Sequence, residues 1–263
     1  MKTVWISALS KNEPRVAAVS QVLKGYGLEP KGHFWIDDNE KMAWRAAFDS
    51  LLEARADVWL VLADSDAATK PSVRYALSLM AAALREARGY GFPIVVLWND
   101  ASAADLPPAF LPATMLLEQK ASWPAKIVAK ANMPAKGAAP DYRFSVAGDE
   151  RLGQWFELGP RANSGSGTGT WHGVVFGVAG EGAEINFQAV GPQGGLPEKT
   201  VLEFAQEGMK LQAGGLEFTA WAVRNEVSAT DSYYARVAGS PQAVLFLPYS
   251  EDGEAEATVL RLS

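Results

Sequence analysis

Residues that could do chemistry lie in short polar segments that follow apolar runs of this 263-residue chain. Carboxylate and hydroxyl oxygens in such segments can anchor a ribose or coordinate a hard cation, and a carboxylate can act as a base. The side chains that could take these roles are Ser7, Ser10, Asp37, Asp64, Ser65 and Asp66. Asp38 and Asp100 occupy comparable positions. Aspartate is also common in loops and helix caps, so a structural role is the alternative for each.

Other catalytic groups are scarce. The chain has no cysteine, which excludes thiol catalysis, disulfides and zinc–thiolate sites. Its two histidines, His33 and His172, stand in different halves, so we expect structural roles rather than a metal cluster or a triad. The pattern SGSGTG at 164–169 resembles a phosphate loop in composition only, because a strand is expected after it, and we interpret it as a hairpin loop. We expect no metal site and no cofactor.

The first half of the chain alternates apolar runs with helical patterns. We expect strands at 3–9, 32–36, 58–63, 93–98 and 115–117, and helices that begin after Asn12, after Asn39, at Pro71 and at Trp123. The run at 58–63 is apolar throughout, which is typical of a parallel sheet covered on both faces, and a polar loop at 64–70 follows it. Right-handed crossovers then give an α/β domain with a five-stranded parallel sheet in the flavodoxin-like order 2-1-3-4-5. Ligands of such sheets bind at the carboxyl edge, where the polar segments lie.

From Tyr142 onward the helical period disappears and the pattern becomes that of an all-β domain. We expect strands at 155–158, 171–178, 185–190, 200–204, 218–223, 233–237, 243–247 and 257–262. Turn pairs such as Gly-Gly and Asp-Gly separate these runs. We therefore predict an α/β domain at 1–131, a linker at 132–141 and an antiparallel β-sandwich domain at 142–263.

Nine tryptophans are many for a chain of this length. Those at 5, 35, 59 and 98 fall on expected strands of the first half, where large aromatic side chains supply core area. Those at 155, 171 and 221 could instead form a stacking platform on the β domain.

The charge of the chain is unevenly distributed. Residues 1–131 hold 15 of the 24 basic and 14 of the 30 acidic residues, so they carry +1 of the net −6 and the rest of the chain carries −7. An acidic second half argues against a nucleic-acid partner, because phosphates need a basic surface. No apolar run is long enough for a membrane span, and the N-terminal run breaks too early for a signal peptide. We expect a cytoplasmic protein with no membrane contact.

The first half resembles a TIR (Toll/interleukin-1 receptor) domain. The resemblance covers residues 1–131 and rests on the order and spacing of four motifs. They are WIS at 5–7 on the first strand, FWID at 34–37 on the second, ADVWLVL at 56–62 on the third, and KPSVRYAL at 70–77 on the following helix. The resemblance implies a flavodoxin-like fold and a role in signalling.

One helix position decides what this resemblance implies for activity. Family members that cleave NAD use a glutamate of that helix on the nicotinamide ribose, and Ala76 aligns with it. The family's Trp-Cys pair in this helix is absent, as is its glycine after the acidic residue of the second strand. The resemblance therefore implies a signalling or interaction protein that acts by self-association or by binding a protein partner, without NAD hydrolysis.

Alternatives use other parts of the chain. A nucleotide-binding protein, or an NAD or nucleoside glycohydrolase, would use the carboxyl-edge loops, with Asp66 or Glu86 replacing the missing glutamate. Nucleoside deoxyribosyltransferases share a similar topology but also need the glutamate. A receiver-type phosphoacceptor site needs an acidic pair after the first strand, where the chain has Ala-Leu-Ser at 8–10. In a third reading the β domain is the binding module, for a sugar or a protein partner.

Overall fold

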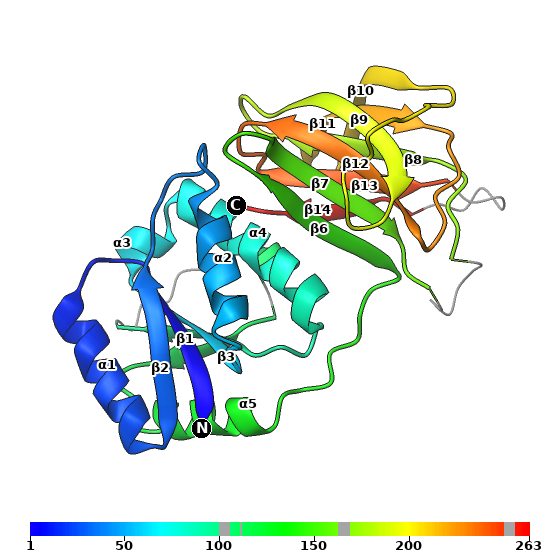
Figure 1. Ribbon diagram of the computed structural model, residues 1–263. Coiled ribbons are helices and arrows are strands. Elements are labelled where there is room, and N and C mark those ends of the chain that lie inside the picture. Colours follow the sequence, from blue (N-terminus) through cyan, green and yellow to red (C-terminus); the bar gives the residue numbers. More distant parts are fainter. Residues whose placement is uncertain (100–105, 111, 163–168, 250–255) are drawn as a thin grey trace. The chain divides into compact units, whose positions relative to one another are not determined.

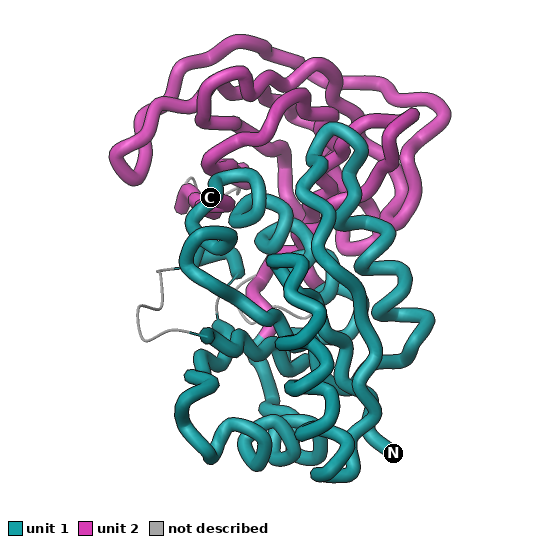
Figure 2. The backbone as a smooth tube through the Cα atoms, turned by 90° about the vertical axis from the view of Figure 1, so that its left-hand side faces the viewer, with its two compact units in different colours: residues 1–138 teal, residues 139–263 magenta. Residues whose placement is uncertain are grey.

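The computed structural model describes residues 1–99, 106–110, 112–162, 169–249 and 256–263 (Figure 1). Contacts between Cα atoms divide the chain into two compact units, residues 1–138 and residues 139–263 (Figure 2). Within the described residues, no helix is both long and apolar enough to cross a membrane.

The first unit is built on a parallel five-stranded sheet. Its strands are β1 (Lys2–Ala8), β2 (Leu28–Phe34), β3 (Val58–Ala63), β4 (Ile94–Trp98) and β5 (Thr114–Leu117). They lie in the order β2-β1-β3-β4-β5, and neighbouring strands are parallel. The predicted flavodoxin-like order is therefore confirmed. The central strand β3 is buried at every position, as its uninterrupted apolar run predicts.

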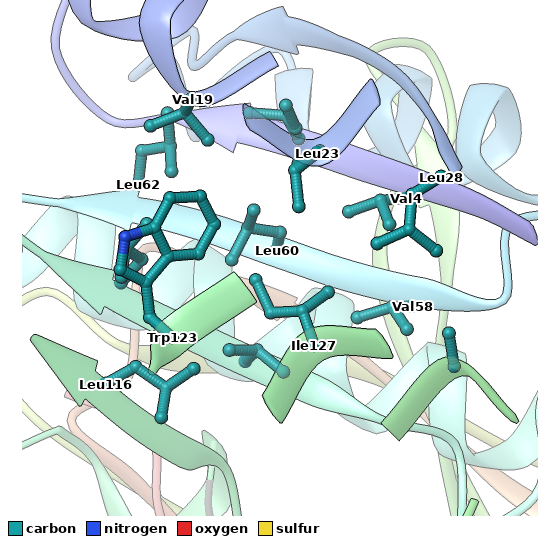
Figure 3. Close-up of a cluster of buried hydrophobic side chains, with 14 of the residues drawn as sticks. Val4, Val19, Leu23, Leu28, Val58, Leu60, Leu62, Leu116, Trp123 and Ile127 are labelled. Atoms are coloured by element: carbon teal, nitrogen blue, oxygen red, sulfur yellow. The ribbon is translucent and has the colours of Figure 1, made fainter. Parts of the chain in front are cut away.

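Helices cover both faces of this sheet. They are α1 (Glu13–Gly25), α2 (Ala43–Glu53), α3 (Ser65–Ala68), α4 (Pro71–Arg88), η1 (Pro108–Phe110) and α5 (Trp123–Asn132). On one face Leu23 of α1 and Ile127 of α5 pack in a buried cluster with Leu60 of β3 (Figure 3). On the other face α2 and α4 contact each other. Because side chains alternate along a strand, Trp5 and Ser7 of β1 point toward this second face.

Three segments of the first unit add to or differ from the sequence expectations. β2 spans 28–34 rather than 32–36, because Leu28 pairs with Lys2 and joins the core cluster. Pro30 weakens the strand pattern there, and an edge strand tolerates it. The polar segment 64–70 contains the short helix α3, capped by Asp64. Part of the expected linker packs on this unit, since a Cβ on Gly91 would meet the carbonyl of Ala135.

The second unit contains two antiparallel sheets, with the orders β10-β11-β8-β13-β14 and β6-β7-β12-β9. The strands are β6 (Tyr142–Asp149), β7 (Gly153–Pro160), β8 (Val174–Ala179), β9 (Glu184–Pro192), β10 (Gln206–Ala213), β11 (Leu216–Val223), β12 (Asp231–Ala238), β13 (Ala243–Pro248) and β14 (Thr258–Arg261). Aromatic rings join the sheets. Phe156 of β7 and Tyr233 of β12 both contact Phe176 of β8, with ring centroids 5.8 and 6.0 Å apart. This is the predicted antiparallel β-sandwich.

The five-stranded sheet of this sandwich curls on itself. β10 and β14 form its opposite edges, yet Leu211 and Val259 pack against one cluster that contains Phe218. Arg261 Nη2 of β14 also donates a hydrogen bond of 2.6 Å to the carbonyl of Gly214, between β10 and β11. The sheet therefore buries apolar side chains on both faces.

One expected strand of the second half, 200–204, is wrong. Val201 and Phe204 are each 82% exposed, and the side chain of Asn225 binds the backbone of this segment in place of a strand ladder. Asn225 Oδ1 accepts from the Glu203 amide (2.9 Å), and Nδ2 donates to the Val201 carbonyl (2.8 Å). The expectations also missed two strands, β6 and β10. The side chains of β10, an edge strand, are mostly exposed and polar. The expected strand at 171–178 begins at Val174, and Trp171 forms an isolated bridge with Val227.

Candidate functional site

Ser10 and Asp64, two of the predicted site residues, meet at the carboxyl edge of the first sheet. Ser10 Oγ donates a hydrogen bond of 2.5 Å to Asp64 Oδ2. Asp64 Oδ1 accepts from the Ala67 amide at 3.0 Å and caps α3. Both oxygens of this carboxylate therefore hold structural hydrogen bonds, as expected of an N-cap residue.

Ser65 and Asp66 follow in the first turn of α3. The carbonyl of Ser65 accepts a hydrogen bond from Thr69 Oγ1 (2.7 Å), and Asp66 is exposed. Asp100, a further expected member of this edge, and residues 164–168 of the expected hairpin loop lie outside the described residues.

Asp37 belongs to a separate group that joins the segment after β2 to the start of α4. Asp37 Oδ2 accepts from Ser72 Oγ (2.8 Å), and Asn39 Nδ2 donates to the Ser72 carbonyl (3.1 Å). Asp38 Oδ1 accepts from the Lys41 amide at 3.0 Å. Ser72 thus anchors this segment to the helix through its side chain and its backbone. Asp37 and Asp38 therefore have the structural role that was the alternative to ligand binding.

Arg15 of α1, which the sequence reasoning missed, spans the same edge. Its Nη1 donates to the Ala63 carbonyl at the end of β3 (3.2 Å), and its Nη2 donates to the Leu97 carbonyl in β4 (3.0 Å). Its Nε donates to Glu118 Oε2 after β5 at 2.9 Å. The Arg15 side chain is 11% exposed. A guanidinium therefore occupies the space where the ends of three strands converge, and its place after the Asn12 cap gave no local signal of this role.

Ala76 lies in the interior of α4. It is 2% exposed, and its neighbours Tyr75 and Leu77 are each 1% exposed. Glu86, one candidate to replace the missing glutamate, accepts a hydrogen bond of 2.8 Å from the Tyr90 hydroxyl. Asp66, the other candidate, is an exposed residue of α3. The aligned catalytic position is thus a packed apolar one.

Ser7 forms a buried hydrogen-bonded chain with two aromatic side chains. Trp59 Nε1 donates to Ser7 Oγ (2.9 Å), and Ser7 Oγ lies 2.8 Å from His33 Nε2. The Ser7 hydroxyl can accept from Trp59 and still donate to or accept from Nε2, so the donor of the second bond depends on the tautomer of His33. Burial lowers the pKa of His33 to about 4, so the ring is neutral near pH 7. Ser7 is fully buried, so this pair does not present a nucleophile.

A pocket of about 240 Å³ lies beside His33, between β2 and α2. Trp5, His33 and Trp35 form its aromatic wall, with the His33 ring centroid 5.8 Å from Trp5 and 6.0 Å from Trp35. The helix wall consists of Trp44 and of the small residues at 43, 46, 47 and 50 of α2. The indole Nε1 atoms of Trp5 and Trp35 are buried and have no hydrogen-bond partner among the residues that the structure describes. An unpaired buried donor costs about 1–3 kcal/mol.

A second concavity, of about 550 Å³, belongs to the second unit. His172, Phe204, Arg224 and Tyr249 are among its lining residues, and the Arg224 guanidinium lies 5.0 Å from the centre of the Tyr249 ring. The exposed segment with Val201 and Phe204 forms one rim. This segment was read as a strand, so sequence reasoning did not find the groove.

The expected stacking platform on the β unit is wrong, because its three tryptophans lie in different surroundings. Trp155 of β7 contacts Phe187 of β9, with ring centroids 5.8 Å apart. Trp171 is 9% exposed and stacks on Phe246. Trp221 is on β11, in the other sheet from Trp155.

Comparisons with known proteins add little to this picture. No family model matches the chain, and no curated protein matches it in sequence. Among solved structures, chemotaxis protein CheY4 of Vibrio cholerae is 17% identical, with a TM-score of 0.33, over 51% of this chain and 99% of that one. A response regulator protein from Burkholderia multivorans is 23% identical, with a TM-score of 0.31, over 52% of this chain and 100% of that one. These values carry no argument about function, and the flavodoxin-like fold follows from the strand order itself.

Proposed function

We propose that the protein is a signalling or interaction protein that acts by binding, through self-association or a protein partner, and that its first unit is a TIR-like domain without NAD hydrolysis. The observation that carries this proposal is the buried Ala76 at the position of the family's catalytic glutamate. A methyl group there supplies no carboxylate to the nicotinamide ribose, and the two candidate replacements, Asp66 and Glu86, lie elsewhere.

The bonding of the carboxyl edge supports the same proposal. Two of the candidate carboxylates already hold structural contacts, since Asp64 caps a helix and accepts from Ser10, and Asp37 Oδ2 accepts from Ser72. Glu118 accepts from Arg15, whose guanidinium also bonds two strand-end carbonyls. These contacts fix the edge without a ligand, as expected of a scaffold rather than of a nucleotide site.

The test combines two measurements on the purified full chain. Incubation with NAD, followed by chromatographic detection of nicotinamide, should give no release above the rate without protein. Sedimentation velocity over a wide concentration range should show whether the chain associates with itself. If it sediments as a single species, the immobilised chain should capture a protein partner from its native source. NAD turnover at a rate typical of TIR enzymes overturns the proposal, and so does a melting temperature raised by nucleotides, because a ligand that binds only the native state stabilises it.

The two units are proposed to be separate domains, at 1–131 and 142–263. The basis is that each unit has its own buried core. Limited trypsin digestion should cut at the exposed Lys136 and leave two resistant fragments. Cleavage inside α4 before Lys136 would argue against this division.

A second candidate function places partner binding on the second unit. Val201 and Phe204 are each 82% exposed, and Phe204 has a φ of +48°, a strained value for a residue other than glycine. Hydrogen bonds from Asn225 hold this segment at the rim of the groove. Two large apolar side chains kept in water suit a protein partner better than a sugar. Phe204→Gly should abolish capture of such a partner, and unchanged capture would refute this role.

A further inference from the structure

The groove of about 550 Å³ in the second unit lies beside the exposed segment with Val201 and Phe204. We propose that it binds a protein segment that carries a carboxylate next to an apolar side chain, and that Arg224 anchors the carboxylate. This inference names the chemistry of the partner, and it rests on the partner binding proposed above for the second unit. It does not depend on the activity of the first unit.

Arg224 is an exposed arginine that directly follows β11 and lines the groove. Its guanidinium lies 5.0 Å from the centre of the Tyr249 ring. Among the described residues, this guanidinium forms no ion pair, and no oxygen accepts from its N–H donors. A guanidinium is planar, and its donors match the two oxygens of a carboxylate. A carboxylate is therefore the complement that this side chain lacks within the described chain.

The ring of Tyr249 gives Arg224 a support of defined position. The ring packs against a buried cluster that contains Ala220, and a Cβ added at Gly173 would lie only 2.6 Å from its Cδ2 atom. The Tyr249 amide also donates a hydrogen bond of 2.9 Å to the Gly173 carbonyl. The cation–π contact thus holds the guanidinium on a packed ring, and this preorganisation lowers the entropy cost of binding.

The charges of the groove favour a ligand with a single negative charge. Glu203 also lines the groove, and its backbone carbonyl accepts from the Arg224 amide at 2.8 Å. Its carboxylate forms no ion pair with Arg224 or with any other described residue. A phosphate group, with a charge of about −1.5 to −2 near pH 7, would be repelled by Glu203 and by the acidic second half of the chain. A carboxylate carries less charge and still pairs with the guanidinium.

Exposed apolar side chains beside Arg224 select the other part of the ligand. Phe204 lines the groove and is 82% exposed, as is Val201. Asn225, the residue after Arg224, bonds the backbone of this segment and so keeps it next to the guanidinium. A ligand that places an apolar side chain against Phe204 and a carboxylate at Arg224 removes apolar surface from water and pairs the cation.

The test is an NMR titration of the nitrogen-labelled full chain with capped dipeptides that differ in one group. Acetyl-Phe-Asp-amide and acetyl-Asp-Phe-amide carry a carboxylate beside a phenyl ring, and their Asn forms carry an uncharged amide of the same shape. The signals to follow are the side-chain Nε–H of Arg224 and the backbone amide of Phe204, assigned by their loss or shift in Arg224→Gln and Phe204→Gly. We expect at least one Asp peptide to shift both signals and to bind about tenfold or more tightly than its Asn form.

Charge variants and a matched control complete the titration. Arg224→Gln should lower the affinity for the Asp peptide about tenfold, as followed at the Phe204 amide. Arg236→Gln should leave the affinity unchanged, because Arg236 also lies over an aromatic ring, 5.9 Å from the centre of Trp155, but does not line the groove. Glu203→Gln removes a like charge and should raise the affinity about two- to fourfold.

Four results overturn the inference. They are equal binding of the Asp and Asn forms, no shift of either signal at the highest soluble peptide concentration, equal affinity in Arg224→Gln and Arg236→Gln, and a lower affinity in Glu203→Gln.

These results are distinct from a failure of partner binding itself, which Phe204→Gly tests through capture of a protein partner. If Phe204→Gly abolishes capture and Arg224→Gln leaves it intact, the carboxylate inference alone is overturned. Capture that persists in Phe204→Gly refutes the partner role of this segment, and the inference falls with it.

Discussion

Lowering the pH should destabilise the first unit through His33. The pKa of His33 is lowered by burial to about 4 in the folded state, against 6.5 for an unperturbed histidine. Between these two values the unfolded chain binds more protons than the folded chain, so stability is full above about pH 6.5 and is lost as the pH falls toward 4. At about pH 5 the loss from this one group is about 2 kcal/mol, since each unit of pKa difference corresponds to about 1.4 kcal/mol.

The assay must report on the first unit alone, because two units can unfold separately. Urea unfolding followed by hydrogen exchange of peptides from residues 1–138 meets this need. His33→Gln is the control, because its side chain does not titrate, and its free energy of unfolding should change less between about pH 7 and about pH 5. Burial opposes the lowered pKa of Asp57, while hydrogen bonds from Lys2 and Thr3 cause it. The stability that Asp57 contributes is therefore lost only below about pH 3.8, which lies outside the pH window of His33.

Two results would refute this reasoning. One is an equal pH dependence of the free energy of unfolding in the natural chain and in His33→Gln. The other is an NMR titration in which His33 protonates near its unperturbed pKa of 6.5. Either result would mean that the imidazole is hydrated in the folded state and that its hydrogen bond with Ser7 does not hold it in the wall of the pocket.

Further predictions concern hydrogen bonds and an exposed side chain that could not be predicted from the sequence. Arg15→Met should lower the free energy of unfolding of the first unit by about 2–3 kcal/mol, because it removes a charge-assisted bond and two strand-end bonds; urea unfolding checks this. Arg45→Met, which loses an exposed helix pair, should cost less than about 0.5 kcal/mol, and an equal loss in both variants would contradict the account. Phe204→Gly should leave stability unchanged or raise it by about 1 kcal/mol, because it relieves a positive φ at little cost in burial; a clear loss in thermal unfolding would show that Phe204 supports the fold. Asn225→Ala should cost about 1 kcal/mol and speed hydrogen exchange of residues 201–203, and unchanged exchange would mean that other contacts hold this segment.

The fold of the first unit could be predicted because its signals are local. The apolar run 58–63 has the length and composition of a strand buried on both faces, and the chain forms β3 at those residues. The helix that begins at Pro71 is also found as expected. Alternation of such elements leaves few sheet orders, and one of the common ones, 2-1-3-4-5, occurs.

The bonding of the candidate site could not be predicted in the same way, because it depends on partners far apart in the chain. Ser10 and Asp64 are 54 residues apart, and Arg15 and Glu118 are 103 apart. The sequence pattern of an aspartate after a strand is the same whether the side chain caps a helix or binds a ligand. The aromatic wall of the pocket did leave a signal, since His33 and Trp35 are two positions apart and follow one face of an extended segment. Only the pairing of β1 with β2 brings Trp5 beside them.

In the second unit the errors have a physical cause. The segment with Val201 and Phe204 has strand-like composition, but its apolar side chains stay in water. Conversely β10 is an edge strand with mostly exposed polar side chains. Its sequence therefore has no apolar run that would predict the pairing with β11. Composition predicted the sandwich, while the exposed segment and the groove beside it followed only from the structure.

The central proposal, that the first unit acts by binding a partner and does not cleave NAD, is tested most directly by nicotinamide release from NAD. The full chain and Asp66→Asn, which removes the exposed carboxylate of α3, should both give no release above the rate without protein. Release by the natural chain that Asp66→Asn abolishes would contradict the account, because it would show that another carboxylate replaces the glutamate missing at Ala76.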